Sequence, residues 1–160
     1  MPTPVRPIGL LPIGFVRRLS EGENERDRSL EAEIVLDERL LPALEGLQDW
    51  SHIYVIFWMD QVDRKGPRSF QHENGIGVLA ARSPMHPNPI GLTLVELLGR
   101  EGSVLRVRGI DALDATPVLD IKPYPDWERG RLIVVTNSSS PMVDEACREA
   151  CAATDVLDWA

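Results

Sequence analysis

The sequence has few of the residues that mark metal-bound or disulfide-stapled proteins. Only two cysteines and three histidines occur among 160 residues. A structural metal site would need further cysteine or histidine ligands at suitable spacing. Cys147 and Cys151 instead complete an apolar stripe on an expected helix, together with Val143, Ala146 and Ala150. We expect them to be small core residues, and we expect no metal.

Long apolar runs and a dinucleotide fingerprint are also missing. No run approaches the roughly 20 apolar residues of a membrane span. The first residues, MPTPVRPIGLLPIG, lack the charged-then-apolar order of a signal peptide. Gly75 and Gly77 form a GxG that has neither a third glycine nor a helical pattern after it. We therefore expect no membrane partner, a cytoplasmic location and no Rossmann-type cofactor site.

The charge is acidic overall but unevenly distributed. The formal net charge is −8, whereas residues 61–140 carry 10 Lys+Arg against 9 Asp+Glu. This balance argues against a generic nucleic-acid coat protein. It leaves room for a local basic patch in the middle of the chain.

Apolar runs separated by turn residues predict a mainly β protein. Many short strands of this kind favour an antiparallel barrel or sandwich over a doubly wound sheet. We expect a single antiparallel β-barrel domain over residues 1–160, with a short helix at 39–47 and a C-terminal helix at about 141–153 that Ser140 and Pro141 open. The expected strands are Ile8–Val16, Ala32–Leu36, Ile53–Met59, Gly77–Ala81, Leu92–Leu98, Val104–Arg108, Pro117–Ile121 and Leu132–Val135.

The segment SPMHPNPIGL, residues 83–92, contains three prolines in ten residues. Each proline fixes its own φ, lacks an N–H donor and restricts the residue before it, so this segment is neither a helix nor a central strand. It is a rigid irregular loop. Such a loop either joins two strands as a stiff turn or holds side chains in position for a ligand.

A second segment, GIDALDATPVLDIKPY at residues 109–124, gathers three aspartates. Asp111 and Asp114 suit turns, because aspartate side chains bond their own backbone. In an extended strand Asp120 and Lys122 point to the same face, about 6.6 Å apart. They can be an exposed charge pair of little energetic worth or part of a site.

These two segments, together with LEGLQDWSHIYVIFWMDQ at residues 44–61, resemble the TsaA-like family, also called TrmO or YaeB-like. The resemblance runs from about Ile8 to Val135. It implies a β-barrel, usually homodimeric, that uses S-adenosylmethionine as cofactor. The implied activity is methylation of the exocyclic N6 amine of threonylcarbamoyl-adenosine next to the anticodon of tRNA.

The resemblance also implies positions for the cofactor. The arginine of the family's ARS motif is Arg82, and the position at the end of its PNPIG motif is Leu92. An arginine can offer two donors to the cofactor carboxylate. The remaining implied cofactor contacts are Asp60, Gln61, Ala112, Leu113, Asp114 and Ala115.

Methyl transfer to a weakly nucleophilic amine needs alignment, and a carboxylate could accept the departing proton. The candidates for such catalytic roles are Asn88, Asp114 and Asp120. We expect tRNA contacts from His86, Pro87, Pro89, Lys122 and Tyr124. Two alternatives stay open, namely methylation of another nucleotide or small molecule and a sensor that binds the cofactor without turnover.

Several positions depart from the family pattern. His86 stands where relatives usually have arginine, so a fixed charge becomes a titratable one. Ala115 stands where relatives have the glycine of a GTP motif, which removes conformational freedom at that turn. The proline-arginine-glutamine segment that helps to hold the cofactor after the first strand in many members has no clear match in RRLSEGENERDRSLEAE, and we expect no counterpart of the extra C-terminal domain of longer members. These departures affect the methyl acceptor more than the cofactor.

Overall fold

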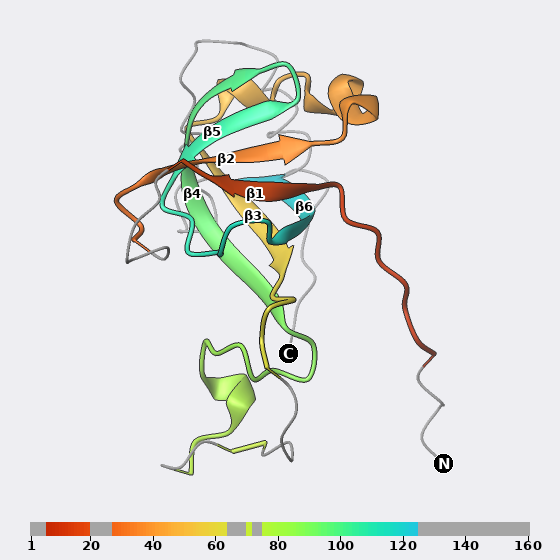
Figure 1. Cartoon of the computed structure of the whole chain (residues 1–160), viewed down its shortest axis with the longest axis vertical. Helices are drawn as coiled ribbons and strands as arrows, with labels where there is room; N and C mark the ends of the chain where they lie inside the picture. Colours follow the sequence, from red (N-terminus) through yellow and green to blue (C-terminus); the bar gives the residue numbers. More distant parts are fainter. Residues whose placement is uncertain (1–5, 20–26, 64–69, 72–74, 125–160) are drawn as a thin grey trace, which may run out of the picture.

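The computed structural model describes residues 6–19, 27–63, 70–71 and 75–124, and six of its strands form a closed antiparallel barrel (Figure 1). Around the barrel the strands follow the order β1-β2-β5-β4-β3-β6. Their bounds are β1 Gly14–Arg18, β2 Glu31–Leu36, β3 His52–Trp58, β4 Ile90–Glu101, β5 Val104–Arg108 and β6 Pro117–Pro123. The predicted barrel is confirmed. The expected C-terminal helix, the strand Leu132–Val135 and both cysteines lie outside the described residues.

The period-two pattern of the sequence fills the barrel interior. Along β2 the side chains of Ala32, Ile34 and Leu36 are buried while those between them are only partly so. Strand β3 repeats this alternation with Ile53, Val55 and Phe57. These residues share one core with Val16, Val95, Leu105, Val107, Ile110 and Val118. The buried apolar face of every strand therefore holds the barrel closed.

Two of the expected strands are corrected by the structure. The first does not begin at Ile8, because β1 starts at Gly14 and residues 6–12 are exposed, with Leu11 at 87%. Pro7 and Pro12 lack the N–H groups that a partner strand would need. Residues 77–81 are not a strand either, since Val78–Ala80 form the 3₁₀ helix η3.

The expected helix at 39–47 is replaced by two 3₁₀ helices, η1 at Glu38–Leu44 and η2 at Leu47–Asp49. Pro42 inside η1 and a left-handed Gly46 between the two explain why no longer helix forms. The Asp37 side chain caps η1 by accepting from the Arg39 amide at 2.9 Å. Hydrogen bonds from the Arg39 side chain and backbone lower the pKa of Asp37 to about 2.

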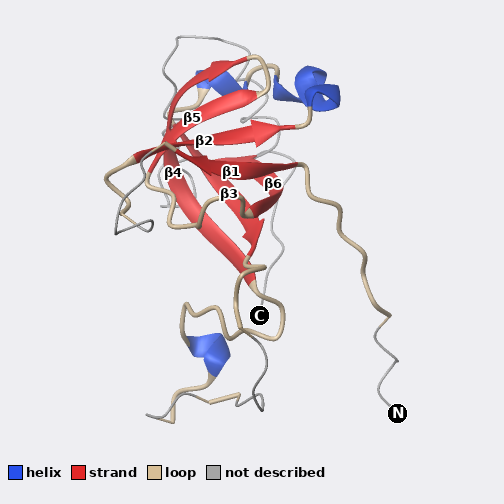
Figure 2. Ribbon diagram, viewed as in Figure 1, coloured by secondary structure: helices blue, strands red, loops and turns tan. Residues whose placement is uncertain are grey.

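The longest pairing joins β3 to β4, from His52 opposite Glu96 to Trp58 opposite Ile90. Figure 2 shows these two strands extending below the rest of the barrel, with η3 and its loops at their lower end. The proline-rich loop enters β4 directly at Ile90. The candidate site lies at this end.

Ala115 adopts a left-handed backbone with φ of 59°. A residue with a Cβ atom is strained there, whereas glycine is not. We expect Ala115→Gly to stabilise the protein by about 0.5–1 kcal/mol, because the relieved strain exceeds the entropy that glycine gains in the unfolded chain. Thermal and urea unfolding would measure this. Gly102→Ala, at a φ of 57°, is the converse control and is expected to destabilise; unchanged or lower stability of Ala115→Gly would contradict the assignment of strain.

Candidate functional site

A cavity of about 800 Å³ lies where the lower ends of β3 and β4 meet the loops. This size suits a ligand of a few dozen atoms. Its wall combines apolar side chains with a few charged ones. The lining residues are Arg28, Tyr54, Phe57, Met59, Asp60, Gln61, Val62, Arg82, Ser83, Pro84, His86, Ile90, Gly91, Leu92, Thr93, Leu94, Asp111, Ala112, Leu113 and Thr116.

Two consecutive residues of β4 hold opposite charges in this cavity. A guanidinium N–H of Arg82 donates to the backbone carbonyl of Leu92. The Thr93 hydroxyl donates to Oδ1 of Asp111 at 2.5 Å. The cation of Arg82, which directly precedes the proline-rich loop, and the anion of Asp111, which follows β5, are thereby both fixed on β4.

The turn after Ala112 is tied to the barrel by its own backbone and carboxylate. The Asp114 carboxylate accepts from the Arg18 amide at 2.7 Å, and the Ala115 amide donates to the Val16 carbonyl at 2.8 Å. From the other side, the Gln61 amide group donates to the Asp114 carbonyl at 2.9 Å. The turn is therefore positioned by two separate parts of the chain.

The proline-rich loop is fixed at both ends. His86 Nε2 lies 2.6 Å from the Ala81 carbonyl oxygen, which makes this nitrogen the donor. At the other end Pro89 is fully buried, and its carbonyl accepts from the Met59 amide at 2.8 Å. The loop is thus ordered by contacts as well as by its prolines, which lowers the entropy lost on binding a ligand.

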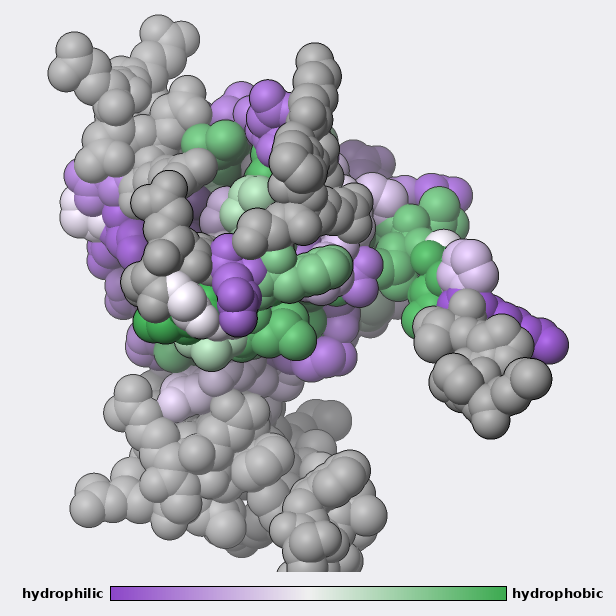
Figure 3. All heavy atoms as spheres, turned by 90° about the horizontal axis from the view of Figure 1, so that it is seen from below, coloured by the Kyte–Doolittle hydropathy of each residue, from purple (hydrophilic) through white to green (hydrophobic). Residues whose placement is uncertain are grey.

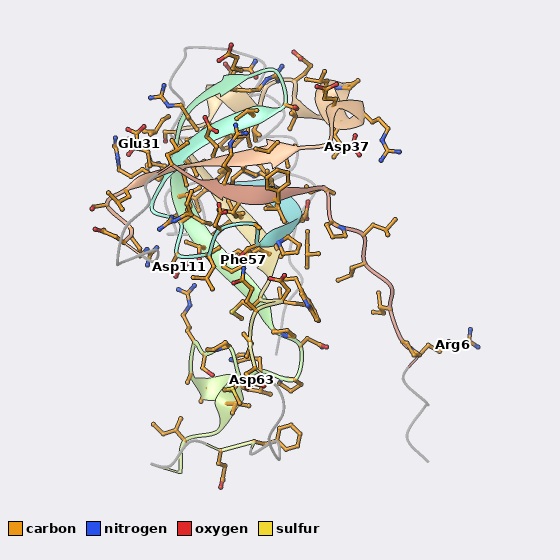
Figure 4. All side chains as sticks on the ribbon, in the orientation of Figure 1. Arg6, Glu31, Asp37, Phe57, Asp63 and Asp111 are labelled. Atoms are coloured by element: carbon orange, nitrogen blue, oxygen red, sulfur yellow. The ribbon has the colours of Figure 1, made fainter. Side chains whose placement is uncertain are left out.

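Aromatic rings complete the apolar wall. Gly91 lies against Phe57, where a Cβ atom at position 91 would come 2.2 Å from the ring. Tyr54, which lines the cavity, packs edge-on against Tyr124 with ring centroids 5.3 Å apart. In Figure 4, Phe57 and Asp111 lie at the lower end of the barrel, above the segment that carries Asp63.

Seven of the predicted site residues line the cavity, namely Asp60, Gln61, Arg82, His86, Leu92, Ala112 and Leu113. The other predicted residues lie outside the lining. Asp114 and Ala115 anchor the turn described above. Asp120 pairs with Lys122 at 2.8 Å, as the strand spacing predicted, and both side chains are substantially exposed.

The remaining four expected residues divide between the loop and β6. Pro87 and Asn88 are exposed, and the Asn88 carbonyl accepts from the Ile90 amide at 2.8 Å. Pro89 is buried in the loop anchor, and Tyr124 packs against Tyr54, which lines the cavity. Their proposed contacts with substrate stay predictions.

Several polar residues line the cavity without having been predicted, namely Arg28, Tyr54, Ser83, Thr93, Asp111 and Thr116. Thr93 and Asp111 each adjoin a residue that was predicted, Leu92 and Ala112. That adjacency was a usable signal. Arg28, whose Nε donates to the Gly109 carbonyl at 3.0 Å, carried no signal in the sequence.

The part of the chain that the structure describes contains no group of three acidic, histidine or cysteine residues able to hold a metal ion. No helix within those same residues is long and apolar enough to span a membrane. Figure 3, which views the molecule from below, shows hydrophobic areas bordered by hydrophilic ones on this face. Phe70, Ile76, Leu79 and Met85, in η3 and the loops around it, are among the exposed apolar side chains.

Together, these observations define a small closed antiparallel barrel with a cavity among the loops at one end. Residues 23–127 match the family model described as the tRNA-methyltransferase O N-terminal domain. The chain belongs to this family, as the motifs indicated.

Individual relatives agree with this assignment. A probable S-adenosyl-L-methionine-binding protein of Methanothermobacter thermautotrophicus is 43% identical over 124 residues, covering 75% of this chain and 88% of the relative. The tRNA (adenine(37)-N6)-methyltransferase of Escherichia coli is 37% identical over 92 residues, covering 51% of this chain but 39% of that enzyme. A crystal structure of TrmO from Pseudomonas aeruginosa matches with a TM-score of 0.63 at 31% identity, covering 87% of this chain and 64% of that one.

Proposed function

We propose that the protein is an S-adenosylmethionine-dependent methyltransferase that methylates N6 of threonylcarbamoyl-adenosine next to the anticodon of tRNA. The observation that carries this proposal is the cavity. It gathers seven of the residues that the family motifs predicted, and it combines a guanidinium, carboxylates and an apolar wall. Relatives named as tRNA (adenine(37)-N6)-methyltransferases support the choice of substrate.

The lining suits the parts of this cofactor. Arg82 provides a bidentate donor for its carboxylate, and the backbone of Ala112 and Leu113 offers donors and acceptors for its base. Phe57 and Leu92 supply apolar surface. When bound, the cofactor supplies an electrophilic methyl group on a sulfonium sulfur.

The residues of this chain contribute to methyl transfer mainly by positioning the cofactor and the acceptor. Both loops are fixed before any ligand binds, so the reacting groups can be aligned at little entropic cost. Asp114 and Asp120 remain candidates for accepting the proton of the amine. In the structure each of these carboxylates accepts from a backbone amide, of Arg18 and Ile121 respectively.

We expect purified protein to transfer radiolabelled methyl groups to tRNA that carries threonylcarbamoyl-adenosine and not to tRNA lacking it. RNA binding should depend weakly on salt, with a slope of log affinity against log salt of roughly −1.5 to −3, as for two to four phosphate contacts. Among the described arginines, Arg106 and Arg108 are already paired with Glu31, at 3.5 and 2.9 Å.

Cofactor binding without transfer to modified tRNA would contradict this substrate and favour a binding protein or another acceptor. A much steeper salt slope would show that the phosphate footprint is larger than the charge distribution indicates. Titrations at several salt concentrations with both forms of tRNA separate these outcomes.

We further propose that the protein is a homodimer that works in the cytoplasm, where its tRNA substrate is found. Support comes from the exposed side chains of Leu79 and Phe70, at 75% and 61%, near the loop end of the barrel. Burying apolar surface of this kind in a symmetric contact is favourable. Light scattering should report twice the chain mass at micromolar concentration, and Leu79→Asp should shift it toward monomer; a monomeric unaltered protein would contradict the proposal.

A further inference from the structure

Among the residues that the structure describes, the hydrogen bond with Thr93 fixes the direction of the Asp111 carboxylate. Its Oδ1 accepts from the Thr93 hydroxyl, and Thr93 is buried with 2% of its surface exposed. Asp111 itself lines the cavity and is only partly buried. A buried hydroxyl that donates to a carboxylate sets its rotamer and leaves the other oxygen available for a ligand.

Asp111 and Arg82 are held by neighbouring residues of β4. Leu92 fixes the guanidinium, and Thr93 fixes the carboxylate. The two charges therefore reach the cavity from one point of β4, while Phe57, Ile90 and Leu92 line it with apolar surface. A ligand that uses both charges must itself carry a cation close to an anion.

An α-amino acid group meets that requirement, because its ammonium and carboxylate are attached to the same carbon. The nucleoside part of the cofactor is uncharged and suits the apolar wall. We propose that Asp111 accepts a hydrogen bond from the α-ammonium group of S-adenosylmethionine, and that Thr93 is the positioning residue that orients it. This inference rests on the proposed function and adds a cofactor-binding residue to it.

The test compares three ligands by calorimetry. S-adenosylmethionine has the amino acid group and a sulfonium, S-adenosylhomocysteine has the amino acid group and a neutral sulfur, and 5′-methylthioadenosine has neither charge. Asp111→Asn should weaken the first two by the same factor, about ten- to hundredfold, and leave the third unchanged. Asp49→Asn, which alters an aspartate on η2 outside the cavity lining, is the matched control and should change none of them.

Thr93→Val should give the same selectivity with a smaller factor, and Thr93→Ser should restore binding, since serine keeps the hydroxyl. A merely structural role for Thr93 would weaken all three ligands together.

Each other pattern overturns the inference. Loss of methylthioadenosine binding by Asp111→Asn would place the carboxylate on the ribose or in the core. A much larger loss for S-adenosylmethionine than for S-adenosylhomocysteine would place the carboxylate beside the sulfonium. If Asp111→Asn bound all three ligands as tightly as the unaltered protein does, Asp111 would not belong to the site. If the unaltered protein bound none of the three, the proposed function would fail and this inference with it, which is distinguishable from a failure of the variant pattern alone.

Discussion

Replacing Arg82 with alanine is expected to weaken S-adenosylmethionine binding by about 1.5–3 kcal/mol, or roughly ten- to 150-fold, because a charge-assisted hydrogen bond to the cofactor is lost. Its contact with the Leu92 carbonyl is lost as well, so the loop becomes less ordered in the free protein. Calorimetry measures the affinity.

Two further variants separate the causes. Arg82→Lys keeps the charge but not the planar fork, so its affinity should fall between those of the unaltered protein and Arg82→Ala. Arg106→Ala removes an exposed arginine on β5 that does not line the cavity, and it should bind cofactor normally. Unchanged affinity in Arg82→Ala would remove this residue from the site.

The second large effect is expected for Gly91→Ala. The added methyl group would come within 2.2–2.7 Å of three atoms of the Phe57 ring, too close for the ring to stay in place. Since Phe57 belongs to both the core and the cavity wall, we expect a loss of about 1–3 kcal/mol in the free energy of unfolding and weaker cofactor binding. Urea unfolding and calorimetry on the same samples measure both.

The same strand offers the control. Gly99 also lies in β4, but a Cβ atom there would meet nothing within 4 Å, so Gly99→Ala should be nearly neutral. Combining Gly91→Ala with Phe57→Leu should cost less than the sum of the two single changes, because the smaller side chain makes room for the methyl group. Strict additivity would argue against the clash with Phe57.

The sequence predicted the barrel well where a strand has one face in the core. Strand β5 was predicted with its observed bounds, and β3 within one residue at each end, because their apolar residues alternate or run continuously between turns. The segment at 77–81 was mistaken for a strand, since a short apolar run does not show whether it will be buried. Leu79 is in fact 75% exposed.

The site was predicted only where a motif named it. Arg82, Leu92 and Ala112 came from family patterns, and the structure brings them together. The pair of Thr93 and Asp111 was missed because the two residues are 18 positions apart, and their contact depends on how β4 and the segment after β5 are placed in space. Local propensity carries no information about such a contact.

The barrel is closed by the pairing of β1 with β6, and this pairing is short. Strands β1 and β6 are joined by only two opposed pairs, Gly14 with Val118 and Phe15 with Pro117, whereas β3 and β4 share seven. The turn that follows Ala112 extends this pairing. The Val16 amide donates to the Thr116 carbonyl at 2.9 Å, and the Ala115 amide donates to the Val16 carbonyl. Local unfolding begins where the fewest bonds must break. We therefore expect a ligand held by this turn to slow amide exchange between β1 and β6, so that occupancy of the cavity and the lifetime of the closed barrel rise together.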